Sequence, residues 1–334
     1  MQSIPLVRAR YAIAFIRALE KRGAPANPYR KSARLSEGLL ENPDGVISAS
    51  SLWKLAGDSG RDPDLCDIGL EAGAMPIDAH GDFGSRVIFA PSLYQAIKAF
   101  CGEARSEYSR SDFYLARDSD TAWFCRGPIE GTGDQVRQIE LYLIMLMMQT
   151  IRRALGPCWK PSQLRLQTRD DRGLERSDVL RGINISFGAP HTAIGIPLAS
   201  LAAPLQKMAG ISVKPLERNP SDSMKQALPE EPLEALIQFL SSHIRFRSLP
   251  IDLAAEVAGV STRTLQRHLM QQGITYTQLI DETRFRLARK MLHDKNFSIT
   301  GIAFELGYSD GAHFSRAFRR MTGLSPRSYR EQYP

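Results

Sequence analysis

The chain has 334 residues, more than one ordinary domain needs and enough for two. Apolar residues make up 43% and charged residues 24%, the values of a soluble globular protein with a sizeable core. The net charge is +7, and residues 245–334 carry +6 of it, with 14 Lys or Arg against 8 Asp or Glu. This concentration predicts a polyanionic partner for the last quarter of the chain. A basic surface that only aids solubility is the alternative.

Other features exclude several classes of protein. The cysteines (Cys66, Cys101, Cys125, Cys158) form no C-x-x-C pair, which argues against a zinc or redox site and for a reduced, cytoplasmic setting. Arginines interrupt the N-terminal apolar run, so a signal peptide is not expected. The most apolar segment, residues 139–151, is too short to span a bilayer, so no membrane partner is expected. Catalytic triad, phosphate-loop and dinucleotide-binding signatures are missing from the sequence, so we predict neither an enzyme nor a cofactor or metal.

The first part of the chain mixes helical and strand patterns. Apolar spacing predicts helices at 8–22, 47–60, 62–73, 91–108 and 135–155. Residues 111–127 predict a hairpin that turns at 117–120, where Asp118 and Asp120 are better explained by a turn than by a carboxylate pair. A strand is expected at 162–171, and one or two strands with a short helix at 183–205. These elements predict an α+β domain over residues 1–212.

The second part is helical throughout. Residues 213–232 contain four prolines and many polar residues, which predicts a linker. Helical periodicity then continues through residues 233–334. The predicted fold is therefore an α+β N-terminal domain followed by an all-α C-terminal domain with two helix-turn-helix units, at about 251–272 and 298–322.

Two segments of the C-terminal part resemble each other. LAAEVAGVSTRTLQRHL (253–269) and IAFELGYSDGAHFSRAF (302–318) align without a gap at an offset of 49 residues, which indicates a duplication. Each has a short apolar helix, a turn with a glycine, and an N-cap residue, Ser261 or Asp310, before a second helix. A single unit of this kind could be a helical hairpin in a core, but two capped copies favour helix-turn-helix units.

The side chains of each second helix divide into an inner and an outer face. Residues four apart, Leu265 and Leu269 or Phe314 and Phe318, are expected to face inward, and Ala254 and Ala303 are the expected small residues of the first helices. The outward residues are then Thr262, Arg263, Thr264, Gln266 and Arg267 in the first copy and Gly311, Ala312, Ser315, Arg316 and Arg319 in the second.

Outward arginine and glutamine on a capped helix fit recognition of the DNA major groove. Arginine binds guanine, and glutamine binds adenine, with two hydrogen bonds. Each such pair of side chain and base contributes about 1–3 kcal/mol of discrimination against the wrong base. Arg320, Arg327 and Arg330 are expected to contact phosphates. Residues 277–292 predict a connecting helix of about 24 Å, which could set two recognition helices in grooves about 34 Å apart. Its basic residues could contact DNA or pair with the neighbouring Asp281 and Glu282: Arg284, Arg286, Arg289 and Lys290.

Three motifs in the C-terminal part resemble the AraC/XylS family of bacterial transcription regulators. They are A-x-x-x-G-V-S-x-R-x-L-Q-R (255–267), R-x-x-x-A-R-K-M-L (284–292) and S-I-x-x-I-A-x-E-L-G-Y-S-D-x-x-x-F-x-R-A-F-R-R-x-x-G-x-S-P-x-x-Y-R (298–330). The resemblance implies a seven-helix DNA-binding domain with two helix-turn-helix units. Its base-reading positions correspond to Arg263, Gln266 and Arg267 and to Gly311, Ala312, Ser315 and Arg316. Gly311 and Ala312 depart from the longer polar side chains of the family pattern.

The first part resembles the arabinose-binding-like N-terminal domain of one AraC subgroup. GDFG (81–84), APSLYQAI (90–97) and FGAPHTAIGIPLASLAAPL (187–205) carry this resemblance, which implies effector sensing and dimerisation. In the Met-rich segment 141–151, Met145 and Met148 are candidate effector contacts, with plain core or a dimer seam as alternatives. His80 and His191 are predicted to be solvent-facing or structural.

The sequence thus predicts a DNA-binding transcription regulator, an activator controlled by a small-molecule effector of the fatty-acid or amino-acid class. It is expected to bind double-stranded promoter DNA as a homodimer and to recruit RNA polymerase. The alternatives are an effector-independent dimeric repressor and a nucleoid-type DNA-binding protein.

Overall fold

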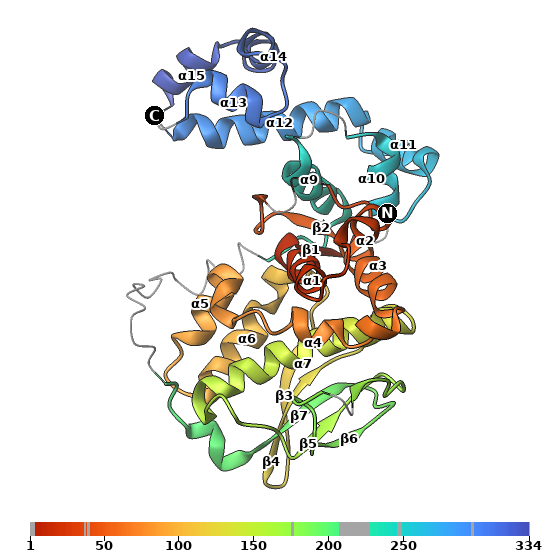
Figure 1. Ribbon diagram of the computed structural model, residues 1–334. Coiled ribbons are helices and arrows are strands. Elements are labelled where there is room, and N and C mark those ends of the chain that lie inside the picture. Colours follow the sequence, from red (N-terminus) through yellow and green to blue (C-terminus); the bar gives the residue numbers. More distant parts are fainter. Residues whose placement is uncertain are drawn as a thin grey trace. The chain divides into compact units, whose positions relative to one another are not determined.

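The computed structural model describes residues 4–36, 38, 41–174, 177–206, 227–245, 249–294 and 297–333. The chain divides into two compact units, an N-terminal unit of Pro5–Leu228 and a C-terminal unit formed mainly by Pro229–Pro334. In Figure 1 the first runs from red to green and the second from teal to blue. Most of the predicted linker, residues 213–226, lies outside the described residues. None of the helices in the described part of the chain combines the length and apolar character needed to cross a bilayer.

The described residues of the N-terminal unit form seven α-helices and two sheets. Its helices are α1 (Ala9–Lys21), α2 (Ala26–Ser32), α3 (Ala49–Gly60), α4 (Ile68–Ala72), α5 (Gly81–Ile88), α6 (Leu93–Glu107) and α7 (Asp134–Leu155), with short 3-10 turns η2 (Pro63–Leu65), η3 (Ile77–His80) and η5 (Leu198–Ala202). Strands β1 (Leu6–Arg8) and β2 (Val46–Ser48) pair antiparallel. The larger sheet has the order β3 (Phe113–Asp118), β4 (Thr121–Arg126), β7 (Thr192–Pro197), β5 (Gln163–Arg165) and β6 (Asn184–Ser186).

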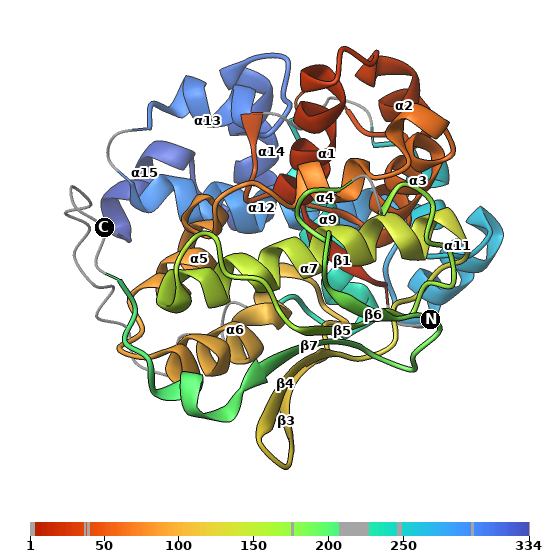
Figure 2. The same ribbon diagram turned by 60° about the horizontal axis from the view of Figure 1, so that its bottom comes forward.

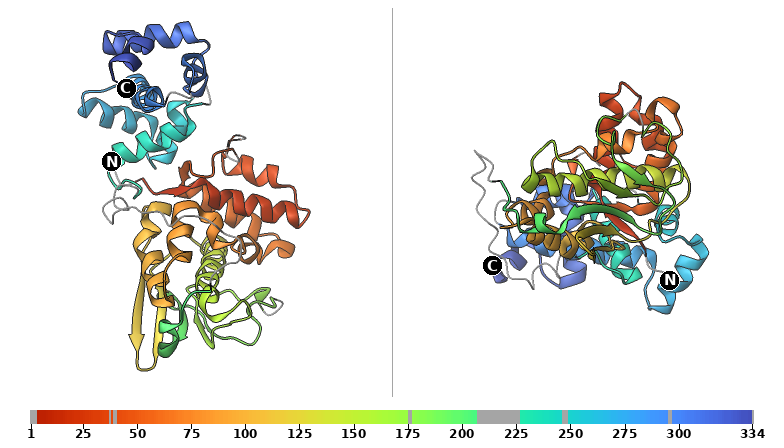
Figure 3. Two further views of the ribbon diagram at one scale, coloured as in Figure 1. Left: turned by 90° about the vertical axis from the view of Figure 1, so that its left-hand side faces the viewer. Right: turned by 90° about the horizontal axis from the view of Figure 1, so that it is seen from below.

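Helix α7 is the central element of this unit. It is apolar around most of its circumference, as expected of a helix that is covered on several sides. Figures 2 and 3 show the larger sheet on one side of α7 and helices α1, α3 and α4 on the other. Gly69 and Gly73 let α4 approach closely, because a Cβ atom at either position would lie within 2.5 Å of an α7 carbonyl oxygen.

Most of the predicted elements of this unit are confirmed. The helix at 135–155 and the hairpin at 111–127 are present, and Ser119 and Asp120 form the two-residue turn of the hairpin. The strand predicted over 162–171 is wrong beyond Arg165. The backbone N–H groups of Gln167 and Thr168 donate to the buried Glu140 carboxylate instead of extending the sheet. The three-residue strands β1 and β2 were not predicted, because they are too short to show a period.

Seven helices form the described part of the C-terminal unit. They are α9 (Pro232–His243), α10 (Ile251–Val257), α11 (Thr262–Gln271), α12 (Tyr276–His293), α13 (Ile299–Glu305), α14 (Gly311–Thr322) and α15 (Pro326–Gln332). Figure 1 shows α10 and α11 towards one end of α12 and α13 to α15 towards the other. Helix α12 has 18 residues, about 27 Å at 1.5 Å per residue, and begins with a capping box of Thr275 and Gln278. It therefore separates two helix pairs by a rigid length.

Candidate nucleic-acid interface and internal cavity

The first helices of the two helix-turn-helix units end with the same backbone geometry. The helices α10 and α13 each end at a glycine in the left-handed region, Gly259 with φ of +64° and Gly307 with φ of +73°. The residue after each glycine donates its N–H to an alanine carbonyl five residues earlier, Val260 to Ala255 at 3.0 Å and Tyr308 to Ala303 at 2.9 Å. This is the Schellman arrangement, which stops a helix sharply. Helices α10 and α13 therefore end with the same backbone geometry before the chain turns towards α11 and α14.

The structure corrects the gapless alignment of the two copies. Helices α10 and α13 correspond at an offset of 48 residues, from their first residues to their glycines, whereas α11 and α14 correspond at 49. The second turn is therefore one residue longer. The equivalent small residues are Ala255 and Ala303, both at most 2% exposed, so the pairing of Ala254 with Ala303 was wrong. The one-residue shift was hidden because Ala254 and Ala255 are both small and buried.

Helix α11 packs against the core through two leucines and has a polar outer face. Its cap is Ser261, whose hydroxyl accepts the backbone N–H of Thr264 at 3.2 Å. Leu265 and Leu269 are at most 1% exposed, as predicted. The predicted outward residues divide in two: Arg263, Gln266 and Arg267 are exposed, whereas Thr262 and Thr264 are half-buried.

Helix α14 has the same plan with a different outer face. Asp310 accepts the His313 backbone N–H at 2.6 Å, and this hydrogen bond lowers the pKa of the Asp310 carboxyl. Phe314 and Phe318 are buried. Ala312, Arg316 and Arg319 are exposed, whereas Gly311 and Ser315 are half-buried, and the Ser315 hydroxyl donates to its own helix at the Gly311 carbonyl, 2.7 Å away. Sequence reasoning missed His313, which is exposed in the first turn, although its position three residues after the Asp310 cap was the signal.

The arginines expected at phosphates differ in their surroundings. Arg327 is exposed and pairs with Glu331 at 3.2 Å, and Arg320 lies 3.6 Å from Asp281. Arg330 instead donates to two backbone carbonyls, Leu292 at 3.0 Å and Phe297 at 2.8 Å. It therefore ties α15 to the end of α12 and has a structural role besides any contact with DNA.

The basic residues of α12 also make contacts within the unit. Arg284 donates from Nε to the Leu306 carbonyl at 3.1 Å and lies 3.9 Å from Asp281. Arg286 pairs with Glu282 at 3.1 Å. These pairs match the intrahelical alternative of the sequence analysis.

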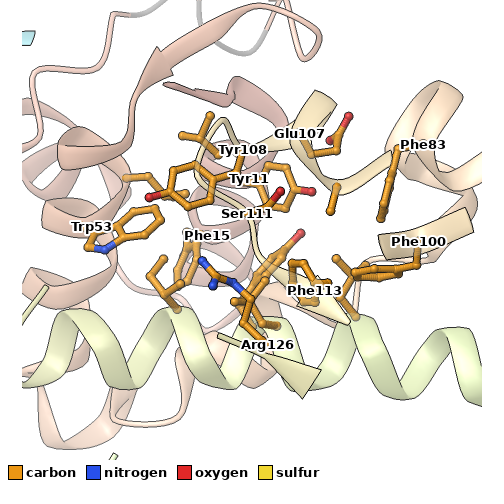
Figure 4. Close-up of a pocket in the computed structure, with 17 residues that line it drawn as sticks. Tyr11, Phe15, Trp53, Phe83, Phe100, Glu107, Tyr108, Ser111, Phe113 and Arg126 are labelled. Atoms are coloured by element: carbon orange, nitrogen blue, oxygen red, sulfur yellow. The ribbon is translucent and has the colours of Figure 1, made fainter. Parts of the chain in front are cut away.

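A cavity of about 40 Å³ lies inside the N-terminal unit (Figure 4). Aromatic side chains from α1, α3, α5, α6 and β3 surround it, and α7 contributes apolar side chains. The labelled aromatic residues are Tyr11, Phe15, Trp53, Phe83, Phe100, Tyr108 and Phe113. Three polar residues, Glu107, Ser111 and Arg126, also line it, and each is less than 9% exposed.

The structure places the two methionine candidates elsewhere. Met145 lines an open depression of about 590 Å³ together with Gln149, Arg152 and Arg153. Met148 is fully buried in the core. The α7 residues that line the cavity, such as Tyr142 and Leu146, lie on a different face of the helix. Composition alone singled out the methionines, whereas the helix face decides which side chains line a cavity.

Two titratable groups are buried beside the cavity. Burial raises the pKa of Glu107 to about 7, against the attraction of Arg10 and Arg8. Burial lowers the pKa of His80 to about 4, and its ring nitrogens lie 3.0 Å from the Tyr142 hydroxyl and 3.1 Å from the Pro76 carbonyl. His80 is therefore structural, one of its two predicted roles.

The raised pKa of Glu107 predicts that the stability of the N-terminal unit depends on pH. The folded state holds the Glu107 proton more tightly than the unfolded chain, so this contribution is complete below the ordinary pKa and is lost as pH rises through 7. We expect the free energy of unfolding to lose about 1–3 kcal/mol from this group between pH 4.5 and 7.5. Urea titrations followed by tryptophan fluorescence would measure it.

The control for this prediction is the exposed Glu20. Glu107→Gln should flatten the pH dependence over this range, whereas Glu20→Gln should not. The contribution of His80 to the free energy of unfolding has the opposite pH dependence, since it is lost as pH falls from 6.5 towards 4. Both variants keep His80, so this contribution is the same in each. A slope that is equal in Glu107→Gln and the parent chain would contradict the assignment.

Comparison with known proteins identifies the family of this chain. A family model described as the arabinose-binding domain of AraC transcription regulators, N-terminal, matches residues 23–205, which include the cavity and the larger sheet. A model described as a helix-turn-helix domain matches residues 254–332, which include both units. The chain belongs to the AraC family of transcription regulators. The predicted family and fold class are thereby confirmed.

Individual relatives agree with this membership. The ornithine utilization regulator of Pseudomonas aeruginosa is 24% identical over 341 residues, covering 98% of this chain and 96% of that protein. The transcriptional activator RhaS of Escherichia coli is 38% identical over 100 residues, 30% of this chain and 36% of that protein. The crystal structure of the regulator CdpR from Pseudomonas aeruginosa covers 92% of this chain and 96% of its own, with 21% identity and a TM-score of 0.41. The similarity to the ornithine utilization regulator thus extends along most of this AraC-family protein.

Proposed function

We propose that this AraC-family protein is a transcription activator that binds promoter DNA as a homodimer, recruits RNA polymerase and responds to a small-molecule effector. The observation that carries the DNA-binding part is the pair of capped helices, α11 and α14, each of which exposes arginine and follows a helix that ends at a left-handed glycine. The name of RhaS as an activator supports the sign of regulation. The cavity within the family's N-terminal domain supports the effector.

In this proposal the exposed side chains of the two helices have different roles. Arg263, Gln266 and Arg267 of α11 hydrogen-bond to base edges, since they are exposed within the first two turns after the cap. In α14, Arg316 is the long exposed side chain at the matching position, beside the short Ala312. We propose that α14 relies more on backbone contacts and DNA shape than α11 does, with Arg319, Arg320 and Arg327 at phosphates.

Footprinting on genomic fragments selected by the full chain tests the proposal. A promoter regulator protects defined sites that contain two half-elements about one helical turn apart. Broad protection without preferred sites would instead indicate a nucleoid-type protein. Transcription from a promoter that holds such a site, with and without the protein, then separates activation from repression.

Base contact and phosphate contact predict different losses for two arginine variants. Arg267→Ala should weaken binding to selected sites by about 1–3 kcal/mol, roughly 5- to 150-fold, with little change on random DNA. Arg327→Ala should weaken both kinds of DNA alike and reduce the slope of log affinity against log salt by about 1. Fluorescence anisotropy at several salt concentrations measures both effects.

Arg327 is the better phosphate variant because Arg330 also holds α15 to α12 through two carbonyls. Loss of binding in Arg330→Ala would therefore mix a contact with a structural change. Equal losses for Arg267→Ala and Arg327→Ala on every DNA would contradict the assigned roles.

A further inference from the structure

We propose that the cavity of the N-terminal unit binds a short, apolar monocarboxylate whose carboxylate group pairs with Arg126. The role of this ligand as the effector rests on the proposed function. Its binding to the cavity does not, because that binding can be measured without DNA. The proposal is carried by a buried cation without a direct ion pair, an unpaired hydroxyl and a largely apolar wall, which all line one cavity.

Arg126 is a buried cation without a direct ion pair, and the carboxylates of Asp112 and Glu130 attract it only from a greater distance. It is 3% exposed, and no carboxylate of the described residues lies within 4.0 Å of its guanidinium group. The other charged residue of the lining, Glu107, has its Oε2 atom 3.6 Å from Arg10 Nε. Burial of a charge is costly unless an opposite charge and hydrogen bonds compensate for it. A ligand with a single negative charge would supply the missing partner of Arg126.

The hydrogen bonds of Arg126 leave one edge of the guanidinium group available. Nη1 donates to the carbonyls of Gly127 at 3.1 Å and Pro128 at 3.2 Å, and Nη2 donates to the carbonyl of Arg110 at 3.5 Å. An arginine has five N–H donors, so one donor on Nε and one on Nη2 are not used by these bonds. Nε and Nη2 form the side of the guanidinium group that binds both oxygens of a carboxylate.

Ser111 provides a second, independent sign of a missing polar partner. Its side chain lines the same cavity and is 5% exposed, and its hydroxyl has no hydrogen-bond partner among the described residues. A buried hydroxyl without a partner costs about 1–3 kcal/mol. A carboxylate oxygen at Arg126 could accept this hydroxyl as well.

The remaining wall determines the body of the ligand. Phe15, Phe100 and Phe113 present aromatic surface around Arg126 (Figure 4), and the α7 side chains are apolar apart from the Tyr142 hydroxyl. A water molecule needs roughly 10–15 Å³ on a comparable scale, so a cavity of about 40 Å³ suits a ligand of few atoms. An acid of two or three carbon atoms meets these conditions. A long-chain fatty acid exceeds the space, and a diamino acid would bring an ammonium group into the apolar wall.

Calorimetry on the full chain tests the proposal with acetate and propanoate as probes. Their primary amides have the same shape without the charge, and L-ornithine is a third probe. The acids should bind and raise the melting temperature, and the amides should bind about 10- to 100-fold more weakly because a charged hydrogen-bond pair is lost.

Two variants and a control assign the site. Arg126→Gln should weaken the binding of the acids by the same factor of about 10 to 100. Ala104→Leu, which adds bulk at a lining position of α6, should abolish acid binding while the unit stays folded. This variant keeps the test decisive if Arg126→Gln does not fold. The control Arg117→Gln lies on β3, where Arg117 is exposed, and should bind like the parent chain.

The proposal is overturned if neither acid binds, if the amides bind as well as the acids, or if Ala104→Leu binds the acids unchanged. Tight binding of L-ornithine that persists in Ala104→Leu also overturns it, because the effector site is then elsewhere. A ligand-free footprint at defined sites, combined with no acid binding, rejects this inference and leaves the proposed function standing. Acid binding without any defined footprint rejects the proposed function and leaves this inference standing.

Discussion

Replacing Phe314 by alanine is expected to unfold the second helix-turn-helix unit and to abolish DNA binding. Phe314 is 1% exposed and lies at the centre of an aromatic cluster, with ring centroids 5.4 Å from Tyr308 and 5.7 Å from Phe318. Truncation of a buried phenylalanine costs about 3–5 kcal/mol, a large share of the stability of a domain of this size. Without this contact, α14 no longer packs against α13.

The position of the tryptophans allows the two units to be measured separately. The three tryptophans, Trp53, Trp123 and Trp159, belong to the N-terminal unit, and residues 229–334 contain none. Phe314→Ala should therefore lower the midpoint of the unfolding transition of the C-terminal unit, which is followed by the loss of helical circular dichroism. The midpoint of the transition followed by tryptophan fluorescence should stay unchanged. Phe304→Ala is the matched control, because Phe304 lies on α13 but is 57% exposed. Normal DNA binding by Phe314→Ala would show that the cluster does not hold α14 in place.

Replacing Glu140 by alanine is expected to destabilise the N-terminal unit by about 3–5 kcal/mol. Glu140 is fully buried on α7, and its carboxylate accepts the backbone N–H groups of Gln167 at 2.7 Å and Thr168 at 2.9 Å and the hydroxyl of Thr192. These three donors come from the segment after β5 and from β7. Alanine would leave all three without their acceptor in a buried place.

Tryptophan fluorescence during urea unfolding measures this effect. Glu140→Gln keeps the shape and one acceptor oxygen and should cost less than Glu140→Ala. Glu20→Ala removes an exposed carboxylate from α1 and should change stability by less than about 0.5 kcal/mol. If Glu140→Ala unfolds at the same urea concentration as Glu20→Ala, the carboxylate does not join α7 to the sheet.

The recognition helices show what local sequence rules can predict. Ser261 and Asp310 accept the backbone N–H groups of Thr264 and His313, as N-cap residues do. Apolar residues four apart face the core in both α11 and α14, so the exposed arginines follow from helical periodicity alone. The one-residue difference between the two turns could not be read in the same way, because neighbouring alanines satisfy either alignment.

The cavity shows where such rules end. Its lining comes from eight helices and strands spread between Val7 and Leu146, and no motif connects Arg126 with Ser111. Met145 and Met148 stood out by residue type, yet Tyr142 and Leu146 face the cavity. Similarly, Arg330 has the composition of a phosphate contact, but its position opposite two carbonyls makes it part of the packing of α15.

The amino-acid sequence by itself determined the division into an α+β part and a helical part, the two capped helices and the arginines on their outer faces. These features depend on interactions within a few residues, so caps, turns and periodicity encode them directly. Only the tertiary structure decided where β5 ends, which face of α7 lines the cavity and which buried charge lacks a direct ion pair. Each of these depends on side chains that are distant in sequence, such as Glu140 and Thr192, and on the space that remains after they pack.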